Sequence, residues 1–169
     1  MPEIEYVEDR MESEELLERL CPPVRNWFKD KFPDFTEPQK VAIPRILNGE
    51  HLLLCSPTGS GKTLTAFLTI IDDLVRRSLD GSLPDAVQCV YISPIKALAN
   101  DIEKNLMGPL GEIKERYLPS RAKEIKVGLR TGDTPQSERE KMLRKPPHIL
   151  ITTPESLGLG LASKRFRPI

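Results

Sequence analysis

The first fifty residues place hydrophobic positions at helical spacing. Three leucines recur among glutamates over 11–20, which predicts a short acidic helix. A second helix is predicted to begin at Pro22 and a third to run over 38–47, because proline favours the first helical turn and Asn48-Gly49 favours a helix end. The chain therefore opens with a helical lead-in.

From residue 51 onward the pattern changes to short apolar runs that alternate with helical patterns. The helical patterns lie over 64–75, 98–106 and 135–145. Strands that alternate with helices indicate an α/β fold with a mostly parallel sheet. The predicted strands are HLLLC (51–55), VQCVYI (87–92), IKVGLR (125–130) and HILIT (148–152).

Three predicted strands end in the same kind of corner, in which Ser or Thr precedes a proline and a helix follows. The corners are Ser56-Pro57, Ser93-Pro94 and Thr153-Pro154. In a parallel sheet such corners share one edge, where helix N-termini offer N–H groups to anions. Turns of this kind also favour Ser-Pro without any ligand, so a single corner does not decide between the two interpretations.

Composition excludes several classes of protein. With 38% hydrophobic and 30% charged residues, the 169-residue chain can bury a core. No run approaches the roughly 18 apolar residues of a membrane span, and the acidic start differs from a signal peptide, so we expect a cytoplasmic protein. The three cysteines lack the spacing of zinc sites, and Cys55 and Cys89 are expected to be small buried hydrophobes.

The net charge is zero, yet the charges are unevenly distributed. Residues 1–20 hold eight acids and two bases, whereas residues 114–169 hold thirteen bases and six acids. The basic C-terminal third could attract phosphate, or it could be an ordinary solvated surface.

The first corner has the residues of a phosphate-binding P-loop. It lies between a predicted strand and an amphipathic helix, the context that such a loop requires. Gly59 and Gly61 let the backbone wrap a phosphate, Lys62 reaches the β and γ oxygens, and the Thr63 hydroxyl can ligate Mg²⁺. The predicted nucleotide-binding residues are Ser56, Pro57, Thr58, Gly59, Ser60, Gly61, Lys62 and Thr63, of which Lys62 and Thr63 are the catalytic candidates.

Upstream of this loop, Gln39 follows Phe35 by four positions. A glutamine amide carries both a donor and an acceptor and so matches N6 and N7 of adenine. An isolated glutamine is more often an exposed polar residue, but its place ahead of a P-loop favours adenine selection.

The sequence shows no strand that ends in the acid that hydrolysis requires. Asp72 and Asp73 end an apolar run, but that run continues the P-loop helix and places Asp72 about 13 Å from the metal. Both acids are predicted to be solvated. A structural role is expected for His51, His148, Trp27 and Phe28.

Five ordered motifs resemble those of superfamily 2 helicases. They are FTEPQ, SPTGSGKT, SPIKALANDI (93–102), RTGDT (130–134) and ILITTPESL (149–157). The chain is most similar to the large helicase-related (Lhr-type) proteins of archaea and bacteria, and the likeness covers residues 32–163. It implies a three-layer, RecA-like P-loop NTPase domain.

The resemblance also implies ligands. Phe35 and Gln39 belong to the adenine-reading motif, and the P-loop to ATP with Mg²⁺. Single-stranded DNA or RNA, or an RNA–DNA hybrid, would be held by its sugar-phosphate backbone. The contact residues so implied are Ser93, Pro94, Lys96, Ala97, Leu98, Thr131, Gly132, Asp133, Thr153, Pro154, Glu155 and Ser156.

The chain departs from the helicase pattern at its C-terminus. The next motif, a box of the Asp-Glu-Val-His type on the Walker B strand, and the second RecA-like domain are expected beyond residue 169. We therefore expect an acidic helical segment over 1–31 and the N-terminal part of a helicase domain over 32–169, in a chain that does not hydrolyse ATP alone. A P-loop kinase or other NTPase, and a non-catalytic nucleotide-binding fragment, are the alternatives.

Overall fold

The computed structural model describes residues 6–94, 102–163 and 166. The chain forms two compact units. The first comprises Met1–Asp73 and Lys104–Pro119, and the second comprises Leu74–Glu103 and Ser120–Ile169.

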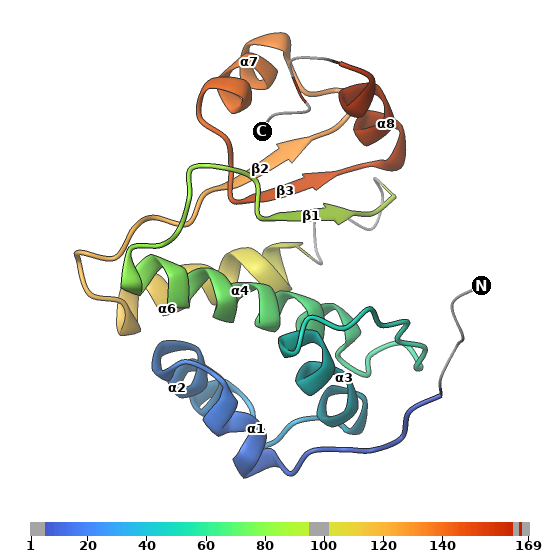
Figure 1. Cartoon of the computed structure of the whole chain (residues 1–169), viewed down its shortest axis with the longest axis vertical. Coiled ribbons are helices and arrows are strands. Elements are labelled where there is room, and N and C mark those ends of the chain that lie inside the picture. The colour runs from blue at the N-terminus through green and yellow to red at the C-terminus, as the bar shows by residue number, and fades with distance from the viewer. Residues whose placement is uncertain (1–5, 95–101, 164–165, 167–169) are drawn as a thin grey trace. The chain divides into compact units, whose positions relative to one another are not determined.

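The first unit is helical, as the opening pattern predicts. The predicted lead-in helices are α1 (Ser13–Arg19), α2 (Pro22–Lys31) and α3 (Glu37–Leu47), and Gly49 after α3 has a positive φ of 79°. The same unit also contains the start of α4 (Lys62–Asp80) and α6 (Gly108–Tyr117) (Figure 1). A π-helical turn over Glu103–Met107 precedes α6. The predicted helix over 98–106 lies partly outside the described residues. The core of this unit includes Leu16, Leu20, Val24, Phe28, Ile43, Phe67, Leu68, Ile71, Leu106 and Ile113.

One contact within the lead-in and one contact to α4 stabilise this arrangement. The Phe28 and Phe35 rings stack with their centroids 4.0 Å apart. The Asp72 carboxylate accepts a hydrogen bond of 2.6 Å from the backbone N–H of Cys21, the N-cap of α2. Asp72 is fully buried and Asp73 half-buried, so the prediction that both are solvated was wrong. The reason is that α2 begins against this turn of α4 and supplies a donor from 51 positions away.

The predicted strand over 51–55 was also wrong, because the structure has no strand there. No described segment pairs with this run, and Leu53 is 83% exposed. Cys55 is exposed instead of buried. An apolar run of strand length becomes a strand only where another strand supplies its hydrogen-bond partners.

The other three predicted strands are confirmed in the second unit. They are β1 (Cys89–Ile92), β2 (Val127–Arg130) and β3 (Ile149–Thr152), and among the described residues they form a parallel sheet in the order β1-β3-β2. The central strand is buried at all four positions. The α/β class with a parallel sheet is confirmed, whereas the end of the chain before a Walker B strand stays a prediction.

Helices α7 (Gln136–Arg144) and α8 (Pro154–Ala162) lie on the same side of this sheet (Figure 1). A Cβ built on Gly128 would approach Pro147 to 2.8 Å and Met142 to 3.6 Å. Two positions later on the same face of β2, Arg130 stacks on the Phe166 ring at 4.1 Å. A Cβ built on Gly160 of α8 would lie 3.3 Å from the Arg130 guanidinium, so both helices lie against the face of the sheet that Gly128 and Arg130 share.

His148 forms hydrogen bonds between neighbouring strands at the end of the sheet where β3 begins. It is fully buried, and its Nδ1 accepts a hydrogen bond of 2.9 Å from the backbone N–H of Lys126. Its carbonyl accepts from the N–H groups of Gln88 and Cys89. Burial, followed by the charges of Lys126 and Lys123, lowers the pKa of this imidazole below 6.5. The neutral ring therefore has the structural role that we expected.

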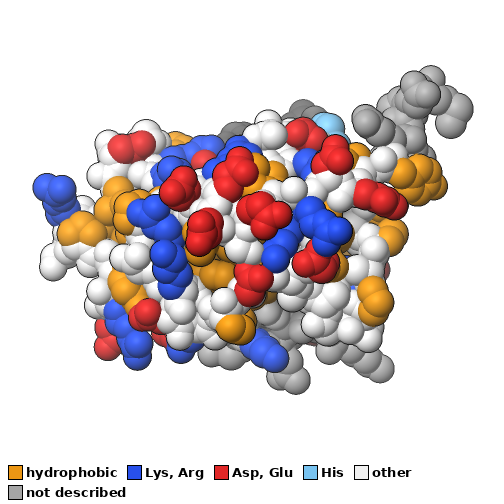
Figure 2. Space-filling view, turned by 90° about the horizontal axis from the view of Figure 1, so that it is seen from below, with side chains coloured by type: hydrophobic (Ala, Val, Ile, Leu, Met, Phe, Trp, Pro, Cys, Tyr) orange, Lys and Arg blue, Asp and Glu red, His pale blue; other side chains and the backbone are white. Residues whose placement is uncertain are grey.

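Figure 2 looks onto one face of the protein, where acidic and basic side chains alternate. No extended area of a single sign dominates that view. No helix of the described residues is long and apolar enough to cross a membrane.

Candidate nucleotide and nucleic-acid site

The predicted P-loop has a backbone that only glycine adopts readily at two positions. Gly59 and Gly61 have φ values of +82° and +87°, in the left-handed region. The Ser56 and Ser60 hydroxyls lie 2.6 Å apart and close the loop, and α4 begins immediately after it at Lys62. Glycines of positive φ before a helix are what a phosphate-binding loop requires, and the predicted role of the loop stays a prediction.

Lys62 is tied to its own loop. Its ammonium group donates to the carbonyl oxygens of Ser56 at 2.5 Å and Pro57 at 2.7 Å. Phosphate oxygens would have to replace these two carbonyls, so part of the electrostatic gain on binding is offset by two lost hydrogen bonds. Thr63 is half-buried in the first turn of α4, and its hydroxyl makes no hydrogen bond with a described residue.

The adenine-reading candidate Gln39 contacts this loop directly. A Cβ built on Gly61 would lie 2.7 Å from Nε2 of Gln39, and the Thr36 hydroxyl donates to the Ser60 carbonyl at 2.9 Å. Gln39 is only 3% exposed, and its Oε1 accepts from the backbone N–H of Thr36. Thr36 and Gln39 thus form the capping box of α3, a role that the Thr-x-x-Gln spacing could have predicted and that our sequence analysis missed.

Phe35 lies behind this arrangement. It is 4% exposed and stacks on Phe28, so its ring is part of the core of the first unit. Its assignment to the nucleotide-binding motif stays a prediction.

The strand ends of the second unit bring the predicted nucleic-acid corners together. Ile92, Thr152 and Arg130 are paired across the three strands, so the chain leaves all of them at one level. The Ser93 N–H donates to the Thr152 carbonyl at 3.1 Å. Thr153 caps α8 by accepting from the Ser156 N–H at 3.3 Å, and Pro154 and Glu155 are exposed beside it. Lys96, Ala97 and Leu98 lie outside the described residues.

The turn over 131–134 is stabilised by its own threonines. The Thr131 N–H donates to the Thr134 hydroxyl at 2.8 Å, and the Thr134 N–H returns to the Thr131 carbonyl at 3.3 Å. Gly132 and Asp133 are exposed at its tip.

A residue that sequence reasoning missed also holds this turn. Arg139, on α7, donates from Nε to the Thr134 carbonyl at 2.9 Å and from Nη2 to the carbonyls of Gly132 at 2.8 Å and Thr131 at 3.2 Å. No periodicity or motif distinguishes Arg139 from the other charged residues of the polar run 135–145. Only the fold brings its side chain to the turn.

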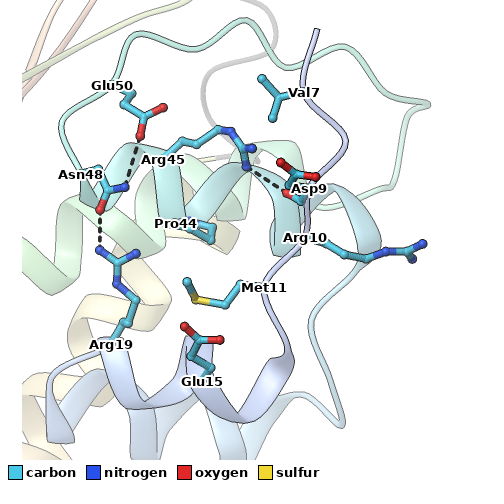
Figure 3. A pocket seen from close by; sticks show the side chains of 10 residues that line it. All are labelled: Val7, Asp9, Arg10, Met11, Glu15, Arg19, Pro44, Arg45, Asn48 and Glu50. Atoms are coloured by element: carbon cyan, nitrogen blue, oxygen red, sulfur yellow. Dashed lines mark hydrogen bonds between the residues drawn. The ribbon is translucent and has the colours of Figure 1, made fainter.

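A separate cavity lies in the first unit. It has a volume of about 420 Å³ and lies between the N-terminal segment, α1 and the end of α3 (Figure 3). Arg19 donates to Asn48 at 2.6 Å, Asn48 to Glu50 at 3.2 Å, and Arg45 to the Asp9 carbonyl at 3.0 Å. Its lining includes none of the predicted site residues. The Arg45 bond holds the N-terminal segment against α3, and the Arg19 bond joins α1 to the C-cap of α3.

The sequence profile of the DEAD/DEAH box helicases matches residues 36–167, most of the chain. The chain belongs to this family. It is 48% identical over 168 residues to ATP-dependent helicase Lhr-Core of Methanocaldococcus jannaschii. The matched region covers 98% of this chain and 20% of that protein. It is 55% identical over 149 residues to the Lhr-Core helicase of Methanothermobacter thermautotrophicus, covering 88% of this chain and 17% of the other.

A solved structure agrees with these relatives. The structure of Mycobacterium smegmatis helicase Lhr bound to ssDNA and AMP-PNP superimposes with a TM-score of 0.75 and 45% identity, covering 89% of this chain and 19% of that one. The chain therefore spans about a fifth of the length of the helicases that it matches. The RecA-like fold and the likeness to Lhr-type helicases, both predicted from the motifs, are confirmed.

Proposed function

We propose that this chain is the ATP-binding portion of an ATP-dependent helicase or translocase that moves on single-stranded nucleic acid. The observation that carries the proposal is the loop before α4, where two glycines of positive φ precede Lys62 and Thr63. A chance Gly-Lys-Thr sequence would not require this backbone. Membership of the DEAD/DEAH family and the AMP-PNP in the Lhr structure support ATP as the nucleotide.

The P-loop residues have separate tasks in this proposal. The N–H groups around Gly59 and Gly61 hold phosphate oxygens. The Lys62 ammonium group exchanges its hydrogen bonds to the carbonyls of Ser56 and Pro57 for bonds to the phosphate and neutralises part of its charge. The Thr63 hydroxyl fits Mg²⁺, which takes few protein ligands and otherwise phosphate and water oxygens. When bound, Mg²⁺ neutralises charge on the phosphates.

The second unit would bind the nucleic-acid backbone. Ser93, Thr131 and Thr153 directly follow the three strand ends at one edge of the sheet, and their hydroxyl and N–H groups suit phosphate oxygens better than base edges. The ssDNA in the related Lhr structure supports a single strand as the partner. We expect little sequence preference.

A non-catalytic nucleotide-binding fragment is the second candidate. Among the described acids, Asp72 is engaged with the Cys21 N–H, and none of the three described strands ends in an acid. No acid at the end of a described strand is therefore available to orient the attacking water. A P-loop kinase is disfavoured, because the family match extends through the Thr131 and Thr153 corners, for which a kinase has no use.

Nucleotide binding tests the proposal. Calorimetry with ATP and Mg²⁺, with and without a single-stranded oligonucleotide, should show ATP binding that the oligonucleotide changes. Absence of ATP binding would contradict the P-loop assignment. Binding that the oligonucleotide leaves unchanged would favour the second candidate.

A further inference from the structure

One guanidinium group from α7 holds the turn over 131–134, in addition to the hydrogen bonds between its own threonines. Arg139 donates to the carbonyl oxygens of Thr131, Gly132 and Thr134. Three carbonyl dipoles thus converge on one cation, and each charge-assisted bond is stronger than a neutral one. We name Arg139 with these three carbonyls the Arg139 clamp.

The clamp determines where the backbone donors of the turn point. A trans peptide group is planar, and its N–H points opposite to its C=O. Because the carbonyls of Thr131 and Gly132 face Arg139, the N–H groups of Gly132 and Asp133 face away from it. Neither N–H has a hydrogen-bond partner within the described part of the chain, and both residues are exposed. Two adjacent N–H donors of this kind suit an anion.

The local charge favours the same ligand. Arg130, which precedes the turn, lies close enough to Arg139 that burial and the charge of Arg139 together lower its pKa. Neither arginine forms an ion pair with an acid that the structure describes. Asp133 is the one acid of the turn, and its single charge leaves an excess of one positive charge over the three groups.

We propose that Arg139 is a positioning residue, which holds the turn 131–134 so that the N–H groups of Gly132 and Asp133 face a phosphate of a single-stranded nucleic acid. The inference rests on the proposed function, because it explains how the turn 131–134 would present its N–H groups to the nucleic acid. Arg139 acts through the backbone that it binds, and it need not touch the phosphate itself.

Three variants separate shape from charge. Arg139→Gln removes the cation, and Arg139→Lys keeps the charge on a group that cannot span three carbonyls in one plane. Arg144→Gln is the matched control, because it removes the same charge from an exposed position of the same helix. Within the described part of the chain, Arg144 forms an ion pair with Glu140 alone, at 3.8 Å. Thermal unfolding verifies that each variant is folded.

The first measurement needs no nucleic acid. Hydrogen exchange of the peptide that contains 131–134 should be faster in both Arg139 variants and unchanged in Arg144→Gln, because the Thr134 N–H bond depends on a fixed turn. Unchanged exchange in Arg139→Gln would overturn the positioning role.

The second measurement is fluorescence anisotropy with labelled oligothymidine and with oligouridine, across a salt series. Arg139→Gln should weaken binding of the oligonucleotide by about tenfold, which is the effect of losing one N–H bond to a charged phosphate. Arg144→Gln should change this affinity far less. Arg139→Lys should retain the parent salt slope without recovering the affinity. Full rescue by lysine would mean that charge alone suffices and would overturn the inference.

The two arms also separate the inference from the function. If exchange accelerates but the parent chain binds neither oligonucleotide, the clamp positions the turn and the nucleic-acid function is wrong. Preference for one oligonucleotide identifies DNA or RNA as the source of the phosphate.

Discussion

Substituting Gly61 by alanine should damage the P-loop more than the same change at Gly59. Both residues have positive φ, so each alanine costs about 1 kcal/mol in backbone energy. At Gly59 nothing lies within 4 Å of the new methyl group, whereas at Gly61 it would meet Nε2 of Gln39 at 2.7 Å. Gln39 is buried, and moving its amide breaks the capping bond to Thr36, which costs about 1 kcal/mol more.

The difference between the two variants is measurable. A loss of about 1 kcal/mol lowers the melting temperature by roughly 2–4 °C in a chain of this size, so Gly61→Ala should melt that far below Gly59→Ala. Entropic effects of alanine on the unfolded chain are the same at both positions and cancel. In the double variant with Gln39→Ala, the additional cost at Gly61 should disappear. Equal melting temperatures for the two single variants would refute the contact between Gln39 and the loop.

Four further predictions concern ATP and pH. Lys62→Ala should abolish ATP binding in calorimetry, because the ammonium is the cation of the loop; binding as tight as that of the parent would contradict the P-loop assignment. Gln39→Ala should narrow the difference in affinity between ATP and GTP, since its amide matches adenine alone; an unchanged ratio would exclude this role. The chain should release phosphate from ATP no faster than its Lys62→Ala variant, even with single-stranded DNA present, and clear turnover above that blank would reveal a catalytic acid among Asp72, Asp133 and Glu155. Because the pKa of His148 is lowered, the native state binds fewer protons than the unfolded chain. Stability against urea should therefore be full above pH 6.5 and fall as the pH drops below it. A stability that does not change with pH in this range would contradict the buried neutral imidazole.

Local patterns predicted those parts of the fold that depend on neighbours in the sequence. Prolines and Asn48-Gly49 mark helix ends, which is why α2 and α3 have nearly the predicted limits. The P-loop glycines have positive φ because the tight turn before α4 requires it. Three of the four apolar runs are strands, because each has a neighbour in the parallel sheet: β3 pairs with β1 on one side and with β2 on the other.

Features that depend on distant partners were not predictable in this way. Residues 51–55 have the composition of a strand, but their sequence cannot say whether another strand lies beside them. Asp72 resembles a surface acid until the Cys21 N–H, 51 positions away, is placed against it. Arg139 is one of several charged residues on α7, and only the fold of the 131–134 turn distinguishes it.

The division of the chain into two units has a consequence for how the protein folds during synthesis. Helix α6, which completes the first unit, is made after β1, which belongs to the second. At about 5–20 residues per second, the ribosome needs several seconds to pass from the end of the first segment to the end of α6. During that interval the face of α2 that packs on α6 is without its partner, and the first strand of the sheet is without its neighbours. The first unit therefore cannot be completed before α6 is made, nor the sheet before β3, and a pause in translation between residues 80 and 117 would prolong the exposure of both apolar surfaces.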